Sequence, residues 1–580
     1  MTAPTGGAMF AVAPIIGCYK TTIPNLKTFD VTIPKTFSEA MASPQKEQWI
    51  LAMDDQITKL NKKHTYEIVD RPKDPYFKLL PGKWVFDTKS DANNFITDWR
   101  ARWVVCGNYQ RPGRDFDDTY APVVTETATK LALSAIAMLG LHAEQVDFVT
   151  AFLNGQLRDK KLYMRTPTGY EQNNKVCLLQ QALYGLRQSA FLWNKTIDRK
   201  LKSMGFQPLS EDPCVYIRKS RKSFAIIYVD DAIIAASTKE EVHQIKKELN
   251  ETFPLKEMGE LNKYLGCHLI RDYEKKTIIL SQAPYVEKIL AEANMISCSP
   301  VRIPMNPKYP KLRDDNSPVD VSCYIHILGQ LNWLSTKSRP DIAFAVSRLQ
   351  RKSSDSTSID VQAAKSLFRY LKGHKDLGIT LGFNPNEGLC VYVDSSFADN
   401  EDGRSTESYV SMFAGAPISW STKKQSFVAT SSTIAEFCAL STATKEAIWL
   451  KKLTVALGLE APGPTTIYSD SANAIGIVNK CGYTSTTKWI DNRYFFVRDA
   501  VQKGLVKIEW IDGKTNPADG LTKPLDHVKH SQFRNLLNMA ECHIKGNTTN
   551  IREIDEGFDE GIFAEETSLD DLADGGCVGA

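Results

Sequence analysis

Two adjacent aspartates, Asp230 and Asp231, interrupt a strongly apolar run at residues 224–236. Such a run predicts two short buried strands, so the charged pair belongs at the tip of a hairpin between them. Neighbouring carboxylates repel each other, and the turn lacks the Asn-Gly or Asp-Gly pair that a simple hairpin prefers. Carboxylates held together on rigid strands suit a divalent cation. The pattern therefore favours a metal site, with a chance turn as the alternative.

A third acid, Asp147, lies near the end of a short strand-like run at residues 145–149, after a predicted helix. Phosphoryl transfer with two metal ions needs carboxylates from separate parts of the chain that converge on the ions. Asp147 has the right context to join Asp230 and Asp231 in such a site. The alternative is a carboxylate that only ends a strand or caps a helix.

Four further acids are spaced through the C-terminal third of the chain. Asp394 follows an apolar run, Glu436 lies on a long predicted helix, Asp470 ends a later strand and Asp519 opens a final short segment. This order of acids resembles that of ribonuclease H, which also uses two Mg²⁺. Single acids have simpler explanations, since residues 433–436 form a capping box and Asp470 could cap a helix. All four in this order favour catalysis.

The elements that must position these acids follow from hydrophobic periodicity and from turn residues. Helices are predicted at residues 37–60, 125–141, 188–204, 242–251, 285–293 and 324–373, and as a short helix near 533–537. Strands are predicted at residues 84–106, 145–149 and 224–236, and in a unit that starts near 389. Four prolines between residues 300 and 310 indicate a linker, and the remaining acidic tail is expected to be disordered.

Composition narrows the class of protein. The chain has 580 residues, of which 42% are hydrophobic and 24% charged, as in soluble globular proteins of three or four domains. A net charge of +3 permits nucleic-acid binding without arguing for it. Its 12 cysteines form no CxxC pair, so neither a zinc site nor a disulfide framework is expected. No apolar run approaches 18 residues, and the first residues do not resemble a secretory signal, so no membrane partner is expected.

Several motifs, in order, resemble those of copia-type (Pseudoviridae) long-terminal-repeat retrotransposon Pol polyproteins, in the region of reverse transcriptase and ribonuclease H. The hairpin reads Tyr228-Val-Asp-Asp231, and residues 181–188 read QALYGLRQ. Other segments close to the family wording are residues 84–86, 100–105, 147–155, 162–170, 258–266, 338–346, 403–406, 415–425 and 518–525. The resemblance covers roughly residues 35–525.

The resemblance implies an α+β and α/β multidomain fold, a right-hand polymerase with fingers, palm, thumb and connection, followed by a ribonuclease H-like domain. The expected divisions are a flexible leader (1–34), fingers and palm (35–237), a thumb-like part (238–300), linker and connection (301–385), the ribonuclease H-like domain (386–525), and a short helix with an acidic tail (526–580).

The resemblance also implies roles for single residues. Asp147, Asp230 and Asp231 would bind two Mg²⁺ in the polymerase site, and Asp394, Glu436, Asp470 and Asp519 would bind two in the nuclease site; Mn²⁺ could replace Mg²⁺. Phe152 would lie under the incoming sugar and exclude a 2′-hydroxyl. Gln188 and Tyr228 would line the nucleotide site. Either Arg100 or Arg102 would hold the triphosphate as a charge-assisted donor.

The expected function is RNA-directed DNA synthesis with degradation of RNA in RNA–DNA hybrids. The partners would be an RNA template, a DNA primer, the hybrid, dNTPs and other products of the polyprotein. The family implies cytoplasmic virus-like particles, with a DNA product destined for the nucleus. The alternative is a domesticated or defective descendant that binds nucleic acid without catalysis, which the presence of all seven acids disfavours. A transposase or integrase would not explain the Asp-Asp hairpin.

Three positions depart from the family pattern. Trp489 and Phe495 stand where the family usually has histidines, and Ile434 stands where an acid is common. None of the three is an expected metal ligand. The departures therefore bear on substrate handling or turnover by the nuclease rather than on metal binding.

Overall fold

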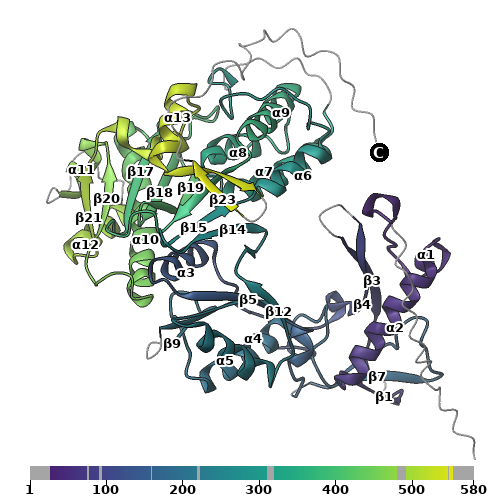
Figure 1. Cartoon of the computed structure of the whole chain (residues 1–580). Helices are drawn as coiled ribbons and strands as arrows, with labels where there is room; N and C mark the ends of the chain where they lie inside the picture. The colour runs from purple at the N-terminus through teal and green to yellow at the C-terminus, as the bar shows by residue number, and fades with distance from the viewer. Residues whose placement is uncertain are drawn as a thin grey trace, which may run out of the picture. The chain divides into compact units, whose positions relative to one another are not determined.

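The computed structural model describes residues 26–74, 77–90, 95–158, 160–218, 222–309, 319–479, 491–545 and 548–552 (Figure 1). The chain divides into two compact units. Unit 1 comprises Met1–Ala121 and Thr150–Ile197, and unit 2 comprises Pro122–Val149 and Asp198–Ala580. The polypeptide therefore passes between the units three times. Within the described residues, no helix is both long and apolar enough to cross a lipid bilayer.

Unit 1 contains a four-stranded sheet with the order β1-β7-β6-β2 and a separate hairpin, β3–β4. Its elements are α1 (Phe37–Ala42), α2 (Lys46–Lys62), β1 (Tyr66–Asp70), β2 (Leu79–Leu80), β3 (Gly82–Ser90), β4 (Ile96–Val105), the 3₁₀ turns η2 (Gly107–Tyr109) and η3 (Ala151–Asn154), β6 (Leu162–Met164), β7 (Lys175–Leu179) and the start of α4 (Ser189–Ser203). The single helix predicted at residues 37–60 is two helices. Pro44 explains the break, because proline disfavours helical geometry in the residue before it.

The β3–β4 hairpin of unit 1 is two-sided. Trp84, Phe86 and Trp103 are buried on one face, where the Trp49 ring of α2 packs 5.2 Å from Phe86. Because side chains alternate along a strand, Arg100 and Arg102 of β4 share the other face. The hairpin thus anchors one face in the core of unit 1 and presents two arginines on the other.

The first sheet of unit 2 has the order β12-β5-β11-β10-β9-β8. Its strands are β5 (His142–Phe148), β8 (Gln207–Pro208), β9 (Val215–Arg218), β10 (Ser223–Tyr228), β11 (Asp231–Ala236) and β12 (Leu255–Glu260), with the helices α3 (Glu126–Met138) and α5 (Lys239–Asn250). Buried α3 residues share a hydrophobic cluster with Ala143, Ile226 and Ile233 of the sheet. The hairpin predicted around Asp230 and Asp231 is confirmed, since β10 pairs with β11 in an antiparallel register.

The second sheet of unit 2 joins distant parts of the chain in the order β13-β14-β15-β16-β22-β23. Its strands are β13 (Lys263–Tyr264), β14 (Cys267–Asp272), β15 (Thr277–Ser281), β16 (Leu377–Leu381), β22 (Met539–Lys545) and β23 (Thr548–Arg552). The expectation that everything after the last helix is disordered is therefore wrong for residues 539–545 and 548–552. Composition misses these strands because they form by pairing: β22 pairs with β16, where Leu377 lies opposite Glu541, and β23 pairs with β22. Residues 553–580 lie outside the described residues.

Four helices of unit 2 share a hydrophobic cluster of their own, which includes Leu328, Leu331, Ile342 and Leu367. They are α6 (Ala283–Glu292), α7 (Val321–Lys337), α8 (Ala343–Gln350) and α9 (Ser358–Gly373). The predicted helical block at residues 324–373 is thus three helices.

The third sheet of unit 2 has the order β19-β18-β17-β20-β21, and α10, α11 and α12 accompany it (Figure 1). Its elements are β17 (Cys390–Ser396), β18 (Thr406–Phe413), β19 (Ala416–Lys424), α10 (Ser432–Ala456), β20 (Thr465–Ser469), α11 (Ala472–Asn479), α12 (Asp491–Gln502), β21 (Val506–Trp510), the 3₁₀ turn η8 (Pro517–Leu521) and α13 (His527–Leu536). The pairs β17–β18 and β18–β19 are antiparallel, whereas β17–β20 and β20–β21 are parallel. The mixed pairing brings the ends of β17 and β20 to one edge, next to α10.

Candidate functional site

One row of side chains crosses four strands of the first sheet of unit 2. Asp231 lies opposite Tyr228 on one side and opposite Asp147 on the other, and Asp147 in turn lies opposite Lys256 of β12. Directly opposed residues of antiparallel strands point to the same face, with Cβ atoms about 5 Å apart. The register therefore places two acids side by side, between a tyrosine and a lysine. Sequence reasoning chose Tyr228, Asp147 and Asp231 but missed Lys256, because strand register is not local information.

Asp230 stands at the tip of the hairpin, beside this row. The backbone N–H of Phe148 donates to the Asp230 carbonyl at 2.7 Å, and the Gln145 side-chain amide donates to Asp231 Oδ1 at 3.4 Å. Val229, just before the pair, has a φ of 55°, a left-handed conformation that a β-branched residue rarely adopts. Strained backbone of this kind persists where its surroundings hold it and is common at functional sites. The tip of the hairpin is thus fixed to the end of β5.

The acids of this row remain accessible. Asp230 is exposed, whereas Asp147 and Asp231 are half-buried. These three acids do not form a set whose oxygens all lie within 4.8 Å of one another. The backbone thus brings the three acids to one strand edge without drawing their carboxylates into a tight cluster.

Unit 1 contains the residues expected at the nucleotide. The ring of Phe152, on η3, lies 5.1 Å from the Tyr184 ring in an edge-to-face arrangement, and the Arg102 guanidinium lies 5.9 Å from that ring. Arg100 instead forms an ion pair with Asp98 at 3.1 Å.

Gln188 has its side-chain amide engaged within unit 1. It is 5% exposed, it accepts from the Gln110 amide at 3.0 Å, and it donates to the Asp115 carbonyl at 3.1 Å. Both ends of the Gln188 amide are therefore used by neighbours.

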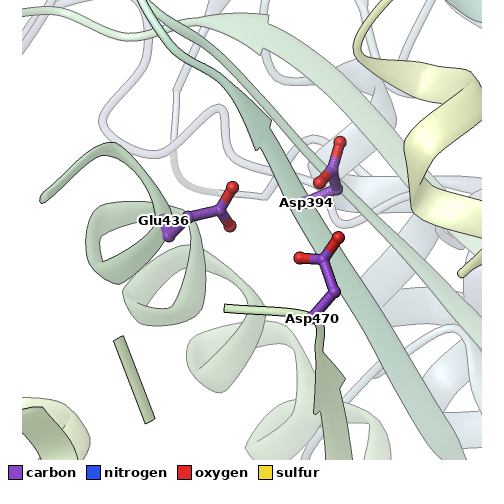
Figure 2. A group of neighbouring side chains, drawn as sticks. All are labelled: Asp394, Glu436 and Asp470. Atoms are coloured by element: carbon purple, nitrogen blue, oxygen red, sulfur yellow. The ribbon is translucent and has the colours of Figure 1, made fainter. Parts of the chain in front are cut away.

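Three acids of the third sheet of unit 2 converge. Asp394 on β17, Glu436 on α10 and Asp470 after β20 point their carboxylates toward one another (Figure 2). One oxygen from each lies within 4.8 Å of the others. Asp394 is 5% exposed and Glu436 is 8% exposed. Elements distant in the sequence thus hold three carboxyl groups close together and largely shielded from water.

The helix-capping explanations for two of these acids are excluded. The residue that caps α10 is Ser431, whose hydroxyl accepts from the Ile434 N–H at 3.3 Å. Glu436 therefore lies inside the helix. The Ser471 hydroxyl accepts from the Ala474 N–H at the start of α11, so Asp470 does not perform that role.

Electrostatics at this cluster favour protonation in the absence of a cation. Burial, followed by the charges of Asp394 and Asp470, raises the pKa of Glu436 to about 9. Burial also raises the pKa of Asp394 to about 6, against the lowering effect of the Thr522 hydroxyl. Burial and then Asp519 raise the pKa of Asp470. Carboxylates crowded in this way shed their protons most easily when a metal ion neutralises them.

The cluster suits a divalent metal ion. Glu436 Oε2 is buried without a hydrogen-bond partner, although its other oxygen accepts from the Ser395 N–H at 3.2 Å. A buried, unsatisfied carboxylate oxygen is costly unless a cation or donor meets it. Oxygen-rich, acidic sites are those that Mg²⁺ and Mn²⁺ prefer.

Asp519, the fourth acid, lies on η8 and is not part of the three-carboxylate set. It forms an ion pair with Lys523, and its charge raises the pKa of both Asp394 and Asp470. The same segment supports Asp394 directly, since the Thr522 hydroxyl donates to Asp394 Oδ2 at 2.6 Å. Sequence reasoning missed Thr522 and Lys523, although both belong to the motif that contains Asp519.

Of the three positions that depart from the family pattern, the structure describes the side chain of one. Ile434 is 4% exposed and belongs to the hydrophobic cluster between α10 and its sheet, where it packs as an apolar residue. Trp489 lies outside the described residues, as does the side chain of Phe495.

Comparison with known proteins adds independent information. A family model described as reverse transcriptase (RNA-dependent DNA polymerase) matches residues 63–307. The retrovirus-related Pol polyprotein from transposon TNT 1-94 of Nicotiana tabacum is 34% identical over 87% of this chain and 39% of its own length. That from transposon RE1 of Arabidopsis thaliana is 32% identical over 87% of this chain and 34% of its own length. A transposon Ty5-1 protein of Saccharomyces cerevisiae is 31% identical over 52% of this chain and 100% of its own length.

The chain thus spans between a third and two fifths of the plant polyproteins. Among solved structures, a foamy viral protease-reverse transcriptase in complex with double-stranded DNA covers 80% of this chain and 69% of its own. Its sequence identity is 12% and its TM-score is 0.44, which is too low to assign the fold.

Proposed function

The chain belongs to the reverse transcriptase family of copia-type retrotransposon Pol polyproteins, and on that premise we propose that it is an RNA-directed DNA polymerase with a fused ribonuclease H. Its substrates would be dNTPs on an RNA template with a DNA primer, and the RNA strand of the resulting hybrid. The observation that carries the proposal is the strand register that sets Asp147 beside Asp231, next to the Asp230 tip.

In the polymerase reaction the primer 3′-hydroxyl attacks the α-phosphorus of the dNTP, and pyrophosphate leaves. Asp147, Asp230 and Asp231 would hold two Mg²⁺, for which Mn²⁺ could substitute. When bound, such ions supply Lewis acidity to the attacking and leaving oxygens. Lys256 adds a positive charge to the row beside Asp147, near enough to temper the repulsion between the acids. The half-buried setting leaves the carboxylates open to a large polyanionic substrate.

In the nuclease reaction water attacks the phosphorus of a phosphodiester in the RNA strand, and the bond from phosphorus to one ribose oxygen breaks as that oxygen leaves and takes up a proton. Asp394, Glu436 and Asp470 would hold the metal ions, and Asp519 would complete the set from η8. Lys523 restrains Asp519 by an ion pair, and Thr522 orients the Asp394 carboxylate. The unsatisfied Glu436 oxygen and the close approach of the three acids support this proposal.

The architecture supports corresponding domain roles. We assign the β3–β4 hairpin to the fingers, the sheet that carries Asp147 and Asp231 to the palm, and α6 to α9 to the thumb and connection. The sheet β19-β18-β17-β20-β21 with α10 would be the ribonuclease H-like domain.

The test is dTTP incorporation on poly(rA)·oligo(dT) with Mg²⁺, comparing the native chain with Asp230→Asn. The expected result is incorporation by the native chain and a loss of at least about a hundredfold in the variant, since a metal ligand is removed. Asp355→Asn is the matched control, because Asp355 is an exposed acid on a loop of the same unit. Absence of incorporation by folded native protein, or equal activity in Asp230→Asn, would contradict the proposal.

A further inference from the structure

A cluster of one cation and two aromatic rings gathers three distant segments of unit 1. Arg102 comes from β4, Phe152 from η3, and Tyr184 from the loop that precedes α4. The Tyr184 ring lies against both partners, 5.1 Å from the Phe152 ring and 5.9 Å from the Arg102 guanidinium carbon. Tyr184 is therefore the contact that Phe152 and Arg102 share.

The backbone holds Tyr184 firmly at this place. The N–H of Val105, on β4, donates to the Tyr184 carbonyl at 2.8 Å. Gly185 follows with a φ of +93°, and a Cβ there would meet the Val105 carbonyl oxygen at 2.0 Å. Only glycine permits so close an approach of two backbones. The loop is thus pressed against the strand that carries Arg102.

The turn that carries Phe152 is also held in place. The Asn154 side-chain amide donates to the Ala151 carbonyl at 3.2 Å, and Lys63 donates to Asn154 Oδ1 at 2.9 Å. The Phe152 ring thus rests on Tyr184 from a turn whose own position is set by hydrogen bonds.

The contact with an aromatic ring leaves Arg102 able to bind an anion. Within the described residues, no carboxylate oxygen lies within 4.0 Å of the Arg102 guanidinium nitrogens, whereas Arg100 is paired with Asp98. A ring face attracts a guanidinium through its quadrupole but does not use up its N–H donors or its charge. Arg102 therefore keeps the donors that a triphosphate requires.

We propose that Tyr184 is a positioning residue of the nucleotide site, where its ring fixes both Arg102 and Phe152. Arg102, rather than Arg100, then meets the triphosphate, and Phe152 is held where it excludes a 2′-hydroxyl. Gln188 is occupied by Gln110 and Asp115, so its part is to support the loop. This inference rests on the proposed polymerase function. It adds the residue that holds Phe152 in the position where Phe152 selects deoxyribose over ribose.

The test compares Tyr184→Leu, Tyr184→Phe and the native chain on poly(rA)·oligo(dT). The readout is the ratio of kcat/KM for dTTP to that for UTP. Tyr184→Leu removes the ring that Phe152 and Arg102 both contact, so neither side chain is held in its position. The substitution should therefore raise the KM for dTTP and lower the ratio about tenfold. Tyr184→Phe keeps the ring and should retain the native ratio.

Two controls separate positioning from general loss of packing. Tyr163→Leu removes a similar edge-to-face pair elsewhere in unit 1, since the Tyr163 ring lies 5.1 Å from that of Phe77, and it should leave the ratio unchanged. When Tyr184→Leu is added to Phe152→Val, it should not lower the ratio further than Phe152→Val alone, because both substitutions act through the Phe152 ring. If Tyr184→Leu does not fold, Tyr184→Met carries the same test with a flexible apolar side chain.

A folded Tyr184→Leu or Tyr184→Met protein that retains the native ratio would overturn this inference alone. An equal loss of discrimination in Tyr163→Leu would also overturn it. Native protein that incorporates neither nucleotide would overturn the proposed polymerase and this inference with it.

Discussion

The two groups of acids differ in how far the protein alone brings them together. Asp394, Glu436 and Asp470 place oxygens within 4.8 Å of one another, and two of the three are buried. Asp147, Asp230 and Asp231 share one strand edge but remain accessible and more widely spread. The first group is a compact, largely buried cluster, and the second is an open row.

The difference follows from the elements that carry the acids. Asp394, Glu436 and Asp470 come from two strand ends and a helix that pack together, so the fold itself forces the three carboxyl groups close to one another. Asp147 and Asp231 come from adjacent strands of one sheet, with Asp230 at the hairpin tip beside them, so the pairing of the strands sets their spacing. An open row leaves its carboxylates accessible, whereas a buried cluster holds protons until a cation takes their place. Two expectations distinguish the two groups of acids, and the one with the larger effect comes first.

The pH dependence of the stability of the metal-free chain should come from the clustered acids Asp394, Glu436 and Asp470 and not from Asp230. The folded-state pKa of Glu436, about 9, lies above its ordinary value of 4.5, so between these pH values the folded state holds a proton that the unfolded state releases. The free energy of unfolding therefore falls as pH rises through this interval. Unfolding in urea with EDTA, from pH 5 to pH 9, measures it.

Mg²⁺ and two substitutions test which acids cause this pH dependence. Mg²⁺ should restore the lost stability at high pH, because it binds the folded state alone. Glu436→Gln should flatten the profile, and Asp230→Asn should leave it unchanged because that carboxylate is exposed. A profile that Asp230→Asn flattens as much as Glu436→Gln would remove the distinction between the two sites.

Substitution of Lys256 should have a smaller effect, and only on the Mg²⁺ dependence of the site with Asp147, Asp230 and Asp231. Its charge lies opposite Asp147 and opposes the entry of another cation. Lys256→Gln should therefore lower the Mg²⁺ concentration for half-maximal incorporation about twofold, as expected for a partly screened charge at the surface. The Mg²⁺ dependence of hybrid cleavage should not change. Lys239→Gln, which removes an exposed charge from the start of α5, is the control. An equal shift in both activities would contradict the assignment of Lys256 to one site.

The sequence predicted what local patterns determine. Apolar runs next to acids correctly placed Asp147 and Asp394 on strands and Asp230 at a hairpin tip, since alternation and turn residues act over a few positions. It could not predict that Lys256 lies opposite Asp147, because register depends on pairing across more than 100 residues. The strand at Met539–Lys545 was not predicted for the same reason, since it forms by pairing with the distant strand β16.

Contacts between side chains were also beyond the sequence. The family resemblance chose Gln188 for the nucleotide and left Arg100 and Arg102 open. Only the folded arrangement shows that Gln188 bonds to Gln110 and that Arg102 lies against Tyr184. A motif identifies the segment that approaches a site, and the packing of that segment decides which of its side chains is free to act.

The central claim is that one chain holds two separate carboxylate sites with separate reactions. The most direct measurement follows both reactions at once, on a labelled RNA template annealed to a DNA primer, with dNTPs and Mg²⁺. Asp230→Asn should abolish primer extension and leave RNA cleavage in preformed hybrid intact, and Glu436→Gln should do the reverse. Loss of both activities in either folded variant, or of neither in both, would contradict the account.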